Sequence, residues 1–364
     1  MAVIGTRGYP SYYGGFETAV RRLAPYLNEA GWDVTVYGRR GSVVKSDPAA
    51  DPTVVSKYTS GVNSKSLSTL TFGATASASA LVRRPDVALV MNVANGFFLP
   101  ALRARGIPTL VNVDGVEWDR AKWNRVAKAV FHAGAAMTAR WADELVFDAR
   151  AIGDRWKKEF DAEGTFIPYG ADTHPLLPLE AGLEHRGYVL YVARFVPENS
   201  VNEFFAAAEV LAESWPVVIV GSDGFHGDFD TRARQLDTTT ARVHWLGHVS
   251  DDERLTSLWQ HAGVYFHGHS VGGTNPALVQ AMANGAPTVA RDTVYNRETL
   301  ANTGVFTEPD PGSIVTAVSG LMRSGDAEQL SHDARERAMS DYSWDGVCQA
   351  YEAALSRLSN QKRS

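Results

Sequence analysis

Short runs of apolar residues alternate with longer helical stretches along almost the whole chain, and this alternation restricts its fold more than any other feature. The runs are rich in Val, Ile and Leu and lack a regular polar residue at every second position. Continuous runs of this kind indicate strands that are buried on both faces, as in a parallel sheet covered by helices on both sides. The sequence therefore predicts an α/β protein built from βαβ units.

The predicted strands fall into two arrays, as expected for two domains in a chain of 364 residues. The strands are expected at 3–5, 34–38, 87–91, 109–113, 144–147 and 165–168, then at 188–193, 216–221, 243–249, 264–267, 288–291 and 305–308. The clearest helices are expected at 16–30, 119–142, 149–160 and 277–284. We predict two doubly wound Rossmann-like domains facing a cleft, residues 1–174 and 188–342, with a Pro-containing linker at 175–187 and a last helix within 343–364.

Composition excludes several classes of protein. The single cysteine, Cys348, excludes an intramolecular disulfide and a thiolate zinc cluster. The longest uncharged run, residues 66–82, consists mostly of Ser, Thr, Ala and Gly, so it predicts a buried or amphipathic helix rather than a membrane span. The N-terminus resembles a strand rather than a signal peptide. We expect a cytoplasmic protein that does not bind nucleic acid.

Charge is shared unevenly between the two halves. Residues 1–178 hold 21 Lys and Arg against 17 Asp and Glu, a net charge of +4, and the remainder has a net charge of −10. A basic half on an acidic protein is compatible with an anionic partner such as a membrane surface or a lipid phosphate. Scattered, solvated charges would give the same totals, and that alternative stays open.

A glycine-rich segment, residues 5–18, joins the first strand to the first helix. Gly14 and Gly15 would let the backbone approach a ligand closely, and amides at a helix N-terminus favour an anion. A plain tight turn is the alternative. The spacing differs from the dinucleotide fingerprint, and the second strand ends in Arg39-Arg40 rather than an acidic residue, so an NADP enzyme remains only an alternative.

A second strand, glycine loop and helix start occur at residues 267–276. Asn275 is placed to cap the helix, with Pro276 at its first position. The amides of residues 273–275 would then form an anion site suited to a diphosphate. His267 and His269 could also be metal ligands, although no carboxylate or cysteine lies nearby in the sequence to complete a site.

Two further motifs place charged side chains at strand ends. Asp114 and Glu117 follow the fourth strand and could act as a base, as electrostatic stabilisers or as acceptor ligands, or simply cap a helix. Arg194 ends a buried strand of the second array, where a guanidinium could bind a diphosphate in bidentate fashion and offset charge on a leaving group.

Together with residues 296–298, these motifs resemble the retaining GT-B glycosyltransferases of family GT4, and more narrowly the bacterial capsule and cell-wall rhamnosyltransferases. The resemblance runs from Gly5 to Trp344. It implies a GT-B fold whose last helix crosses back to the N-terminal domain, a donor held mainly by the C-terminal domain, an acceptor held by the N-terminal domain, and no cofactor or essential metal.

The resemblance also implies the roles of individual residues. The catalytic set is Arg194, Asp114 and Glu117. The donor-binding set is Gly14, Gly15, Arg194, Asn199, Gly221, Gly247, His248, Val249, His269, Gly272, Gly273, Thr274, Asn275 and Gln280. The acceptor-binding set is Arg7, Tyr13, Phe16, Glu17 and Trp118.

This chain departs from the family pattern at four positions. Gly272 and Gln280 stand where many GT4 enzymes have glutamates, Asn199 where a lysine is usual, and Asp114 where many have a histidine. An amide at 280 can still bond a ribose hydroxyl, though more weakly than a carboxylate. The diphosphate is therefore expected to depend more on Arg194 and on backbone amides.

The predicted function is transfer of a sugar with retention from a nucleotide-sugar, with dTDP-β-L-rhamnose as the leading donor. The expected acceptor is a polyprenyl-diphosphate-linked sugar or a polysaccharide in cell-envelope glycan synthesis. A nucleotide-sugar 2-epimerase and an inactive nucleotide-sugar-binding homologue are the alternatives.

A further hypothesis is that the protein binds peripherally to the inner face of the membrane. Arg120, Lys122, Arg125 and Lys128 flank apolar side chains on the helix predicted beside the acceptor motif, a pattern typical of an interfacial helix. Packing of those apolar side chains on the sheet is the alternative.

Overall fold

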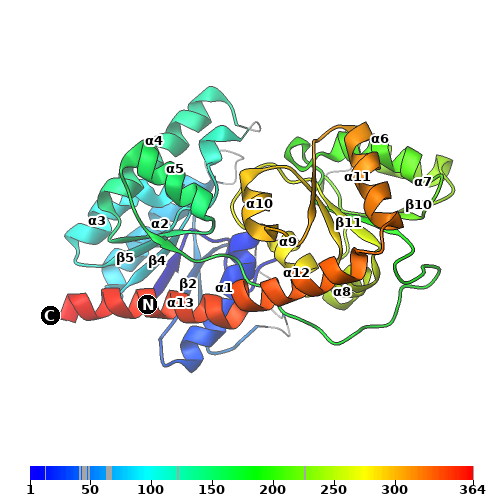
Figure 1. The fold of residues 1–364 in the computed structure, drawn as a ribbon. Helices are drawn as coiled ribbons and strands as arrows, with labels where there is room; N and C mark the ends of the chain where they lie inside the picture. Colours follow the sequence, from blue (N-terminus) through cyan, green and yellow to red (C-terminus); the bar gives the residue numbers. More distant parts are fainter. Residues whose placement is uncertain are drawn as a thin grey trace. The chain divides into compact units, whose positions relative to one another are not determined.

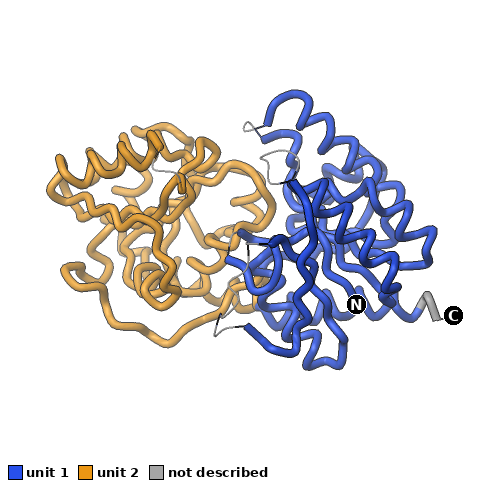
Figure 2. The backbone as a smooth tube through the Cα atoms, turned by 180° about the vertical axis from the view of Figure 1, so that it is seen from behind, with its two compact units in different colours: residues 1–169, 344–364 blue, residues 170–343 orange. Residues whose placement is uncertain are grey.

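The computed structural model describes residues 1–12, 14–40, 42, 47, 50–62, 68–120, 123–224 and 227–363. Tyr13 and Lys122, both singled out from the sequence, lie outside the described residues. The chain divides into two compact units, which Figure 2 shows in two colours. Unit 1 comprises Met1–Tyr169 and Trp344–Ser364, and unit 2 comprises Gly170–Ser343. Each unit contains one parallel sheet with helices on its faces, which confirms the predicted α/β class (Figure 1).

Unit 1 carries a sheet with the strand order β3-β2-β1-β4-β5-β6-β7 within the described residues. Its strands are β1 (Ala2–Ile4), β2 (Thr35–Arg39), β3 (Val55–Thr59), β4 (Ala88–Met91), β5 (Thr109–Asn112), β6 (Glu144–Phe147) and β7 (Thr165–Phe166). Its helices are α1 (Gly15–Glu29), α2 (Ser68–Arg83), α3 (Leu99–Ala104), α4 (Arg125–Trp141), α5 (Arg150–Phe160) and α13 (Trp344–Arg363), with the 3₁₀ turns η1 (Val93–Phe98) and η2 (Glu117–Asp119).

Unit 2 carries a second sheet with the order β10-β9-β8-β11-β12-β13. Its strands are β8 (Val189–Val192), β9 (Val217–Val220), β10 (Val243–Trp245), β11 (Val264–His267), β12 (Thr288–Arg291) and β13 (Val305–Thr307). Its helices are α6 (Val201–Leu211), α7 (Asp228–Thr239), α8 (Asp252–His261), α9 (Pro276–Ala283), α10 (Val294–Leu300), α11 (Pro311–Arg323) and α12 (Ala327–Asp341), with the 3₁₀ turn η3 (Pro197–Asn199).

The inner strands of unit 2, β9, β8, β11 and β12, are buried on both faces, as their continuous apolar runs predict. Tyr191 and Phe266 lie in one core cluster together with residues of α6 and α11. Their neighbours along the strands, Leu190 and Tyr265, lie in another cluster with residues of α8, α9 and α12. Alternate side chains therefore serve opposite cores, because successive residues of a strand point to opposite faces of the sheet.

Most predicted strands coincide with observed ones to within one or two residues, and the main exception is β3. Its sequence, Val-Ser-Lys-Tyr-Thr, carries polar residues in the middle, and the strand lies at the edge of its sheet, where side chains such as Val55 and Tyr58 reach solvent. The helix predicted at 119–142 was also too long. It begins at Arg125, where the side chain of Asn124 caps it by accepting a hydrogen bond from the Ala127 amide.

The segment predicted as a linker, residues 175–187, is bonded to helix α8 of unit 2. Ser257 Oγ donates to the Pro178 carbonyl at 2.6 Å, and Arg254 makes two hydrogen bonds with the Glu180 carboxylate at 2.7 and 3.0 Å. The Leu177 amide donates to Gln260 Oε1 at 2.8 Å. Residues 254, 257 and 260 follow the spacing of one helix face, so one side of α8 holds this segment. The division between the units falls at Tyr169–Gly170, earlier than the boundary expected at 174.

Helix α13 comes last in the sequence but belongs to unit 1, as the family resemblance implied. Tyr351, Leu355 and Leu358 join the core cluster that also holds Leu23 of α1 and Leu89 of β4. The Asn112 amide donates to the Tyr351 hydroxyl at 2.6 Å, which ties the helix to the end of β5. The N-terminal unit is therefore completed by the C-terminal residues of the chain.

We predict that Leu355→Ala lowers the free energy of unfolding by about 2–5 kcal/mol, because it leaves a cavity in a fully buried position. The measurement is urea unfolding of the Leu355→Ala variant and of the unsubstituted protein. Asn360→Ala, on an exposed position of the same helix, is the matched control and should change stability little. Equal unfolding midpoints for Leu355→Ala and the unsubstituted protein would contradict this packing.

Candidate active site

The strand order reverses between β8 and β11 in unit 2, and the motif residues of this unit follow those two strands. The strands pair in parallel, with Phe266 opposite Tyr191, so their carboxyl ends meet at one edge of the sheet. Arg194 follows β8, and His267 ends β11. In doubly wound sheets, ligands bind in the crevice at such a switch point. The two motifs therefore meet where the topology predicts a ligand.

The loop that carries Arg194 is anchored through its backbone. Asn199 is buried, and its Nδ2 donates to the Arg194 carbonyl at 2.8 Å. The Asn199 carbonyl in turn accepts from the Tyr191 hydroxyl at 2.8 Å. The Arg194 side chain itself is exposed. An amide at 199 thus positions the strand end from which the arginine projects, in place of the lysine that the family usually has there.

Hydrogen bonds join the segments that follow β8, β11 and β12 in unit 2. Ser200 Oγ donates to the Gly268 carbonyl at 2.8 Å, and both the amide and the hydroxyl of Ser270 donate to the Glu198 carbonyl, at 3.0 and 2.8 Å. Asn296 Nδ2, from the first turn of α10, donates to the His269 carbonyl at 3.0 Å and to the Arg291 carbonyl at 2.8 Å, so the start of α10 and the end of β12 join the other two segments. The sequence marked Asn296 within a motif, but it gave no signal for Ser200, which adopts a left-handed φ of 56°.

Helix α9 begins as the sequence predicts. Asn275 Oδ1 accepts from the Ala277 amide at 3.0 Å, and Pro276 occupies the first turn. Gly272 has a φ of 108°, which favours glycine, and the space beside its Cα is open. Thr274 is buried and Gln280 is half-buried. The first amides of a helix form a partial positive charge, so this end of α9 is suited to an anionic group.

His267 is a buried histidine beneath this loop. Its Nδ1 lies 2.8 Å from the Tyr265 hydroxyl, which is 3.4 Å from the Val192 carbonyl. The His269 ring stacks on the His267 ring, with centroids 4.3 Å apart and an angle of 11° between the planes. Burial, and secondarily His269, hold the pKa of His267 well below its usual range, so the ring is neutral near pH 7. His267 Nδ1 therefore has a partner, whereas its buried Nε2 has no hydrogen-bond partner among the described residues, and the two stacked rings pack beneath the loop.

The remaining predicted donor residues follow β9 and β10. The Gly221 amide donates to the Gly247 carbonyl at 2.7 Å, and the Gly221 carbonyl accepts from Trp245 Nε1 at 2.9 Å. A Cβ at position 221 would collide with the Ala193 carbonyl beside Arg194, so this glycine allows the two strand ends to approach. His248 is exposed, and Val249 packs against the core.

The glycine segment of unit 1 lies at the equivalent switch point, after β1 and beside β4. Gly5 has a φ of 95°, and a Cβ there would collide with the Met91 carbonyl at the end of β4. Gly14 precedes α1 in extended backbone, and Gly15 starts the helix in contact range of the Tyr169 ring. Glu17 is buried and accepts from the Arg7 amide at 3.1 Å. Phe16 packs against the core of unit 1, so Phe16 and Glu17 shape the loop.

The acidic motif after β5 contains one half-buried and one buried carboxylate. Asp114 is half-buried with a φ of 63°, and its amide donates to Asn112 Oδ1 at 2.9 Å. Non-glycine residues in this region are uncommon and often mark functional sites. Burial, and secondarily Asp114, raise the pKa of the Tyr169 hydroxyl. Glu117 is buried and engaged, with Arg120 at 2.6 Å and Trp123 Nε1 at 2.8 Å.

The side chain of Trp118 is buried in an aromatic cluster. Its ring meets those of His132, Trp156 and Phe160 edge-on, with centroid distances of 5.5, 6.3 and 5.9 Å. Aromatic pairs in this geometry stabilise a fold by more than their area alone. The structure thus gives Trp118 a packing role and Glu117 a hydrogen-bonding role.

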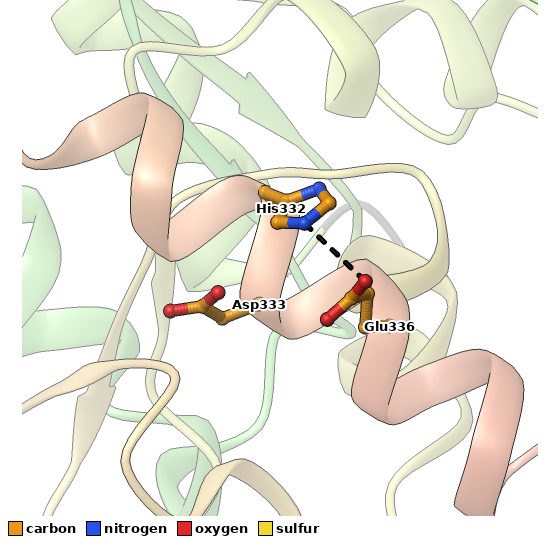
Figure 3. A group of neighbouring side chains, drawn as sticks. All are labelled: His332, Asp333 and Glu336. Atoms are coloured by element: carbon orange, nitrogen blue, oxygen red, sulfur yellow. Dashed lines mark ion pairs between the residues drawn. The ribbon is translucent and has the colours of Figure 1, made fainter.

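One group of side chains in the described residues has its potential metal-binding atoms within 4.8 Å of one another, and it lies on α12. Figure 3 shows His332, Asp333 and Glu336 on this helix, with an ion pair of 3.3 Å between His332 and Glu336. The histidine and the glutamate are exposed, and exposed acidic groups are common without a metal. None of these residues belongs to the motifs described above, so the group is best explained as a surface ion pair on one helix face.

Comparisons with known proteins identify both units. Residues 181–340 match the family model described as glycosyl transferases group 1, and residues 14–170 match the glycosyl transferase 4-like domain. The chain belongs to the GT4-like glycosyltransferases. O-antigen chain mannosyltransferase B of Escherichia coli is 22% identical over 139 residues, which are 37% of this chain and 36% of that enzyme. The match thus spans about a third of the length of that relative.

Solved structures show that this transferase has the GT-B fold. Sucrose-phosphate synthase of Thermosynechococcus elongatus superposes with a TM-score of 0.80 at 20% identity, over 98% of each chain. Alr3699/HepE of Anabaena, in complex with UDP, superposes with a TM-score of 0.76 at 15% identity, over 98% of this chain and 99% of the other. At these identities the likeness concerns the fold alone.

We predict that His267→Phe makes stability less dependent on pH. The pKa of His267 is below the ordinary value of 6.5 in the folded protein, so only the unfolded chain takes up this proton as the pH falls below that value. Stability is therefore lost on acidification, by up to about 1.4 kcal/mol per pH unit for one such group. Phenylalanine has no proton to bind, so the loss should be smaller.

The measurement is urea unfolding at pH 7.5 and pH 5.5. His332→Phe, at an exposed position of α12, serves as the control and should keep the full acid-induced loss. If His267→Phe and the unsubstituted protein lost equal stability between the two pH values, a neutral buried His267 would be excluded.

Proposed function

We propose that this transferase moves a sugar from a nucleoside-diphosphate donor, bound by unit 2, to a hydroxyl of a glycan acceptor, bound by unit 1. The observation that carries the proposal is the set of interlocked loops at the switch point of unit 2, where the exposed Arg194 lies with Asn199, Ser270 and Asn296 holding the backbone. A guanidinium and the first amides of α9 are both partners for a diphosphate. The solved structure of Alr3699/HepE with UDP is consistent with a nucleotide ligand for this fold.

The proposed reaction proceeds with retention at the anomeric carbon. The bond between that carbon and the diphosphate oxygen breaks, and its electron pair stays on the diphosphate. The acceptor oxygen forms the new bond on the same face, and its proton passes to the departing diphosphate. Arg194 offsets the charge that develops on the leaving group, which is usually the largest catalytic effect of this kind. Asp114 would orient the acceptor hydroxyl.

The leading donor is dTDP-β-L-rhamnose, and the leading acceptor is a lipid-linked or polysaccharide glycan of the cell envelope. The motifs at residues 267–276 and 296–298 support this choice through their resemblance to rhamnosyltransferases. A mannosyl donor is the second candidate, because the E. coli relative is a mannosyltransferase. Gly272 and Gln280 replace the usual glutamates beside the sugar and ribose, so we expect weaker donor binding than in enzymes with both carboxylates.

The decisive experiment is a donor panel analysed by mass spectrometry, with and without a polyprenyl-diphosphate-linked acceptor. A glycosyltransferase requires the acceptor and adds one sugar mass to it. A nucleotide-sugar 2-epimerase would release nucleotide without an acceptor, and an inactive binding homologue would bind nucleotide without turnover. Transfer from dTDP-rhamnose supports the leading assignment, and transfer from GDP-mannose alone replaces it.

We predict that Arg194→Ala lowers turnover at least about a hundredfold, as the loss of one oxyanion-stabilising donor does. The fold should survive, because the exposed guanidinium is not part of a core and the loop is held through the Arg194 carbonyl. Initial rates at saturating donor provide the measurement, and Arg103→Ala, at an exposed position of α3, is the control. Near-normal turnover of Arg194→Ala would remove this residue from the mechanism.

A second prediction concerns divalent metals. The diphosphate has a guanidinium and backbone amides as partners. The one Asp-x-Asp in the sequence, Asp228–Asp230, starts helix α7 after β9, and its Asp230 carboxylate already accepts hydrogen bonds from the Ser222 hydroxyl and the Asp223 amide, so this pair is not arranged as a Mg²⁺ site. We therefore expect activity to persist when EDTA is added to the assay. Loss of activity in EDTA that Mg²⁺ or Mn²⁺ restores would show that the donor site is assigned wrongly.

We also propose that the cytoplasmic enzyme binds the inner membrane face through the start of α4. No helix in the described ranges has the length and apolar character to cross a bilayer. The buried residues of α4 are Gly134, Ala135 and Thr138, all in its second half. In its first turn Val126 is 73% exposed, although packing on the sheet would have buried it. Arg125 beside it is exposed as well. An apolar side chain flanked by cations suits an anionic lipid surface.

Vesicle sedimentation tests this surface. The enzyme should bind vesicles with anionic lipid but not neutral ones, and binding should weaken in 1 M salt, where the Debye length falls to about 3 Å. Substitution of Lys122, Arg125 and Lys128 by Gln should abolish binding, whereas the charge-matched set Arg83, Arg103 and Lys158 to Gln should preserve it. Equal binding to both kinds of vesicle, or to neither, would reject the membrane role.

A further inference from the structure

A polar groove lies at the edge of the sheet in unit 1, between strand β3 and helix α2. It has a volume of about 540 Å³. This volume is within the usual range for small-molecule sites and is large enough for a sugar residue. Its side chains come from β2, β3 and α2 and from the residues directly after the two strands. None of the motifs assigned to the donor or the acceptor contributes to it.

Hydrogen bonds between the helix and the sheet define the floor and one wall. Tyr37 is buried and pairs with Lys57 in the register of β2 and β3, so both side chains lie on the face that α2 covers. Ser79 Oγ donates to the Tyr37 hydroxyl at 3.4 Å. Thr75 Oγ1 donates to the Ser60 carbonyl at 2.7 Å, which ties α2 to the residue after β3. The groove is therefore shaped by ordered contacts.

The groove is rich in hydrogen-bond donors and positively charged. Arg40 and Lys57 line it, and in the described part of the chain no hydrogen bond or ion pair engages either side chain. The described lining residues include no Asp or Glu. Tyr58 lines it as well and is 40% exposed, whereas Tyr37 is buried beneath it. Two cations, several hydroxyls and an accessible aromatic ring complement a ligand that has both anionic oxygens and a sugar ring.

We propose that this groove binds an anionic sugar residue, one that carries a carboxylate or a phosphate, on the acceptor glycan. Arg40 and Lys57 bind the anionic group, and the exposed Tyr58 and the Ser and Thr residues of the lining contact the sugar. The site lies apart from the transfer chemistry and selects acceptors by charge. As part of the acceptor side it rests on the proposed function, although binding itself needs no turnover.

Protection of a sheet edge is the simpler explanation for Lys57, since lysines on edge strands prevent pairing with another chain. That explanation accounts for neither Arg40, which lies beyond the end of β2, nor the absence of a carboxylate among the described lining residues. It also predicts no binding of a sugar. The two explanations therefore differ in what the isolated protein binds.

The test uses saturation-transfer difference NMR of the full chain with glucose 6-phosphate, glucuronate and neutral glucose. We expect both anionic sugars to bind more tightly than glucose, and inorganic phosphate to compete with glucose 6-phosphate. Lys57→Gln and Arg40→Gln should each weaken binding about tenfold, as loss of one charge-assisted hydrogen bond does. Lys57→Arg should retain most of the affinity. Arg103→Gln removes the same charge from an exposed position on α3 and should have no effect.

Binding of UDP and dTDP, measured calorimetrically on the same samples, separates this inference from the proposed function. Unchanged nucleotide affinity together with weaker sugar binding in the Lys57 and Arg40 variants supports the groove. Sugar binding that is absent, equal for glucose and the anionic sugars, or equal in the variants and the unsubstituted protein overturns it. If the unsubstituted protein binds neither UDP nor dTDP, the proposed donor site is overturned instead, whatever the groove binds. If only glucose 6-phosphate binds through Arg40 and Lys57, the anionic group is a phosphate; if only glucuronate does, it is a carboxylate.

Discussion

The close approach of strand ends at the two switch points depends on positions that have no Cβ. At Gly268 a side chain would collide with the Asn199 carbonyl, and at Gly221 with the Ala193 carbonyl. Gly5 allows the same approach between β1 and β4 in unit 1. Because the loops meet at van der Waals distance, buried amides and hydroxyls such as Asn199, Ser200 and Asn296 can bridge their carbonyls. The exposed Arg194 therefore projects from a backbone that these hydrogen bonds hold in place.

Several polar residues that a motif search assigns to chemistry have structural partners instead. Glu17 accepts from the Arg7 amide, and Glu117 is bonded to Arg120 and Trp123. Leaving such a buried carboxylate without partners would cost several kcal/mol or more. These glutamates consequently shape the loops from which their neighbours act. Asp114 is half-buried and differs from both glutamates in its left-handed backbone.

The hydrophobic core of unit 1 is completed by its last helix, α13. Helix α13 supplies Tyr351, Leu355 and Leu358 to a cluster whose other members come from α1 and from β1, β2, β4, β5 and β6. The opposite face of the sheet carries α2 and the groove beside β3. The loops after β1 and β5, the start of α4 and the groove thus occupy different parts of unit 1, and each can change in sequence without disturbing the others.

The sequence by itself determined the class of fold, most strand positions, the cap at Asn275 and the family of the enzyme. Those properties follow from local patterns: apolar runs, glycine loops and capping residues act within a few positions. Strand β3 escaped prediction because a polar edge strand lacks the apolar run. Tertiary structure alone decided that Glu117 and Trp118 turn inward, that Ser200 and Tyr265 support the donor loops, and that Val126 reaches solvent. Partners far apart in sequence set those outcomes, and the geometry that joins them arises only when the sheets and helices pack.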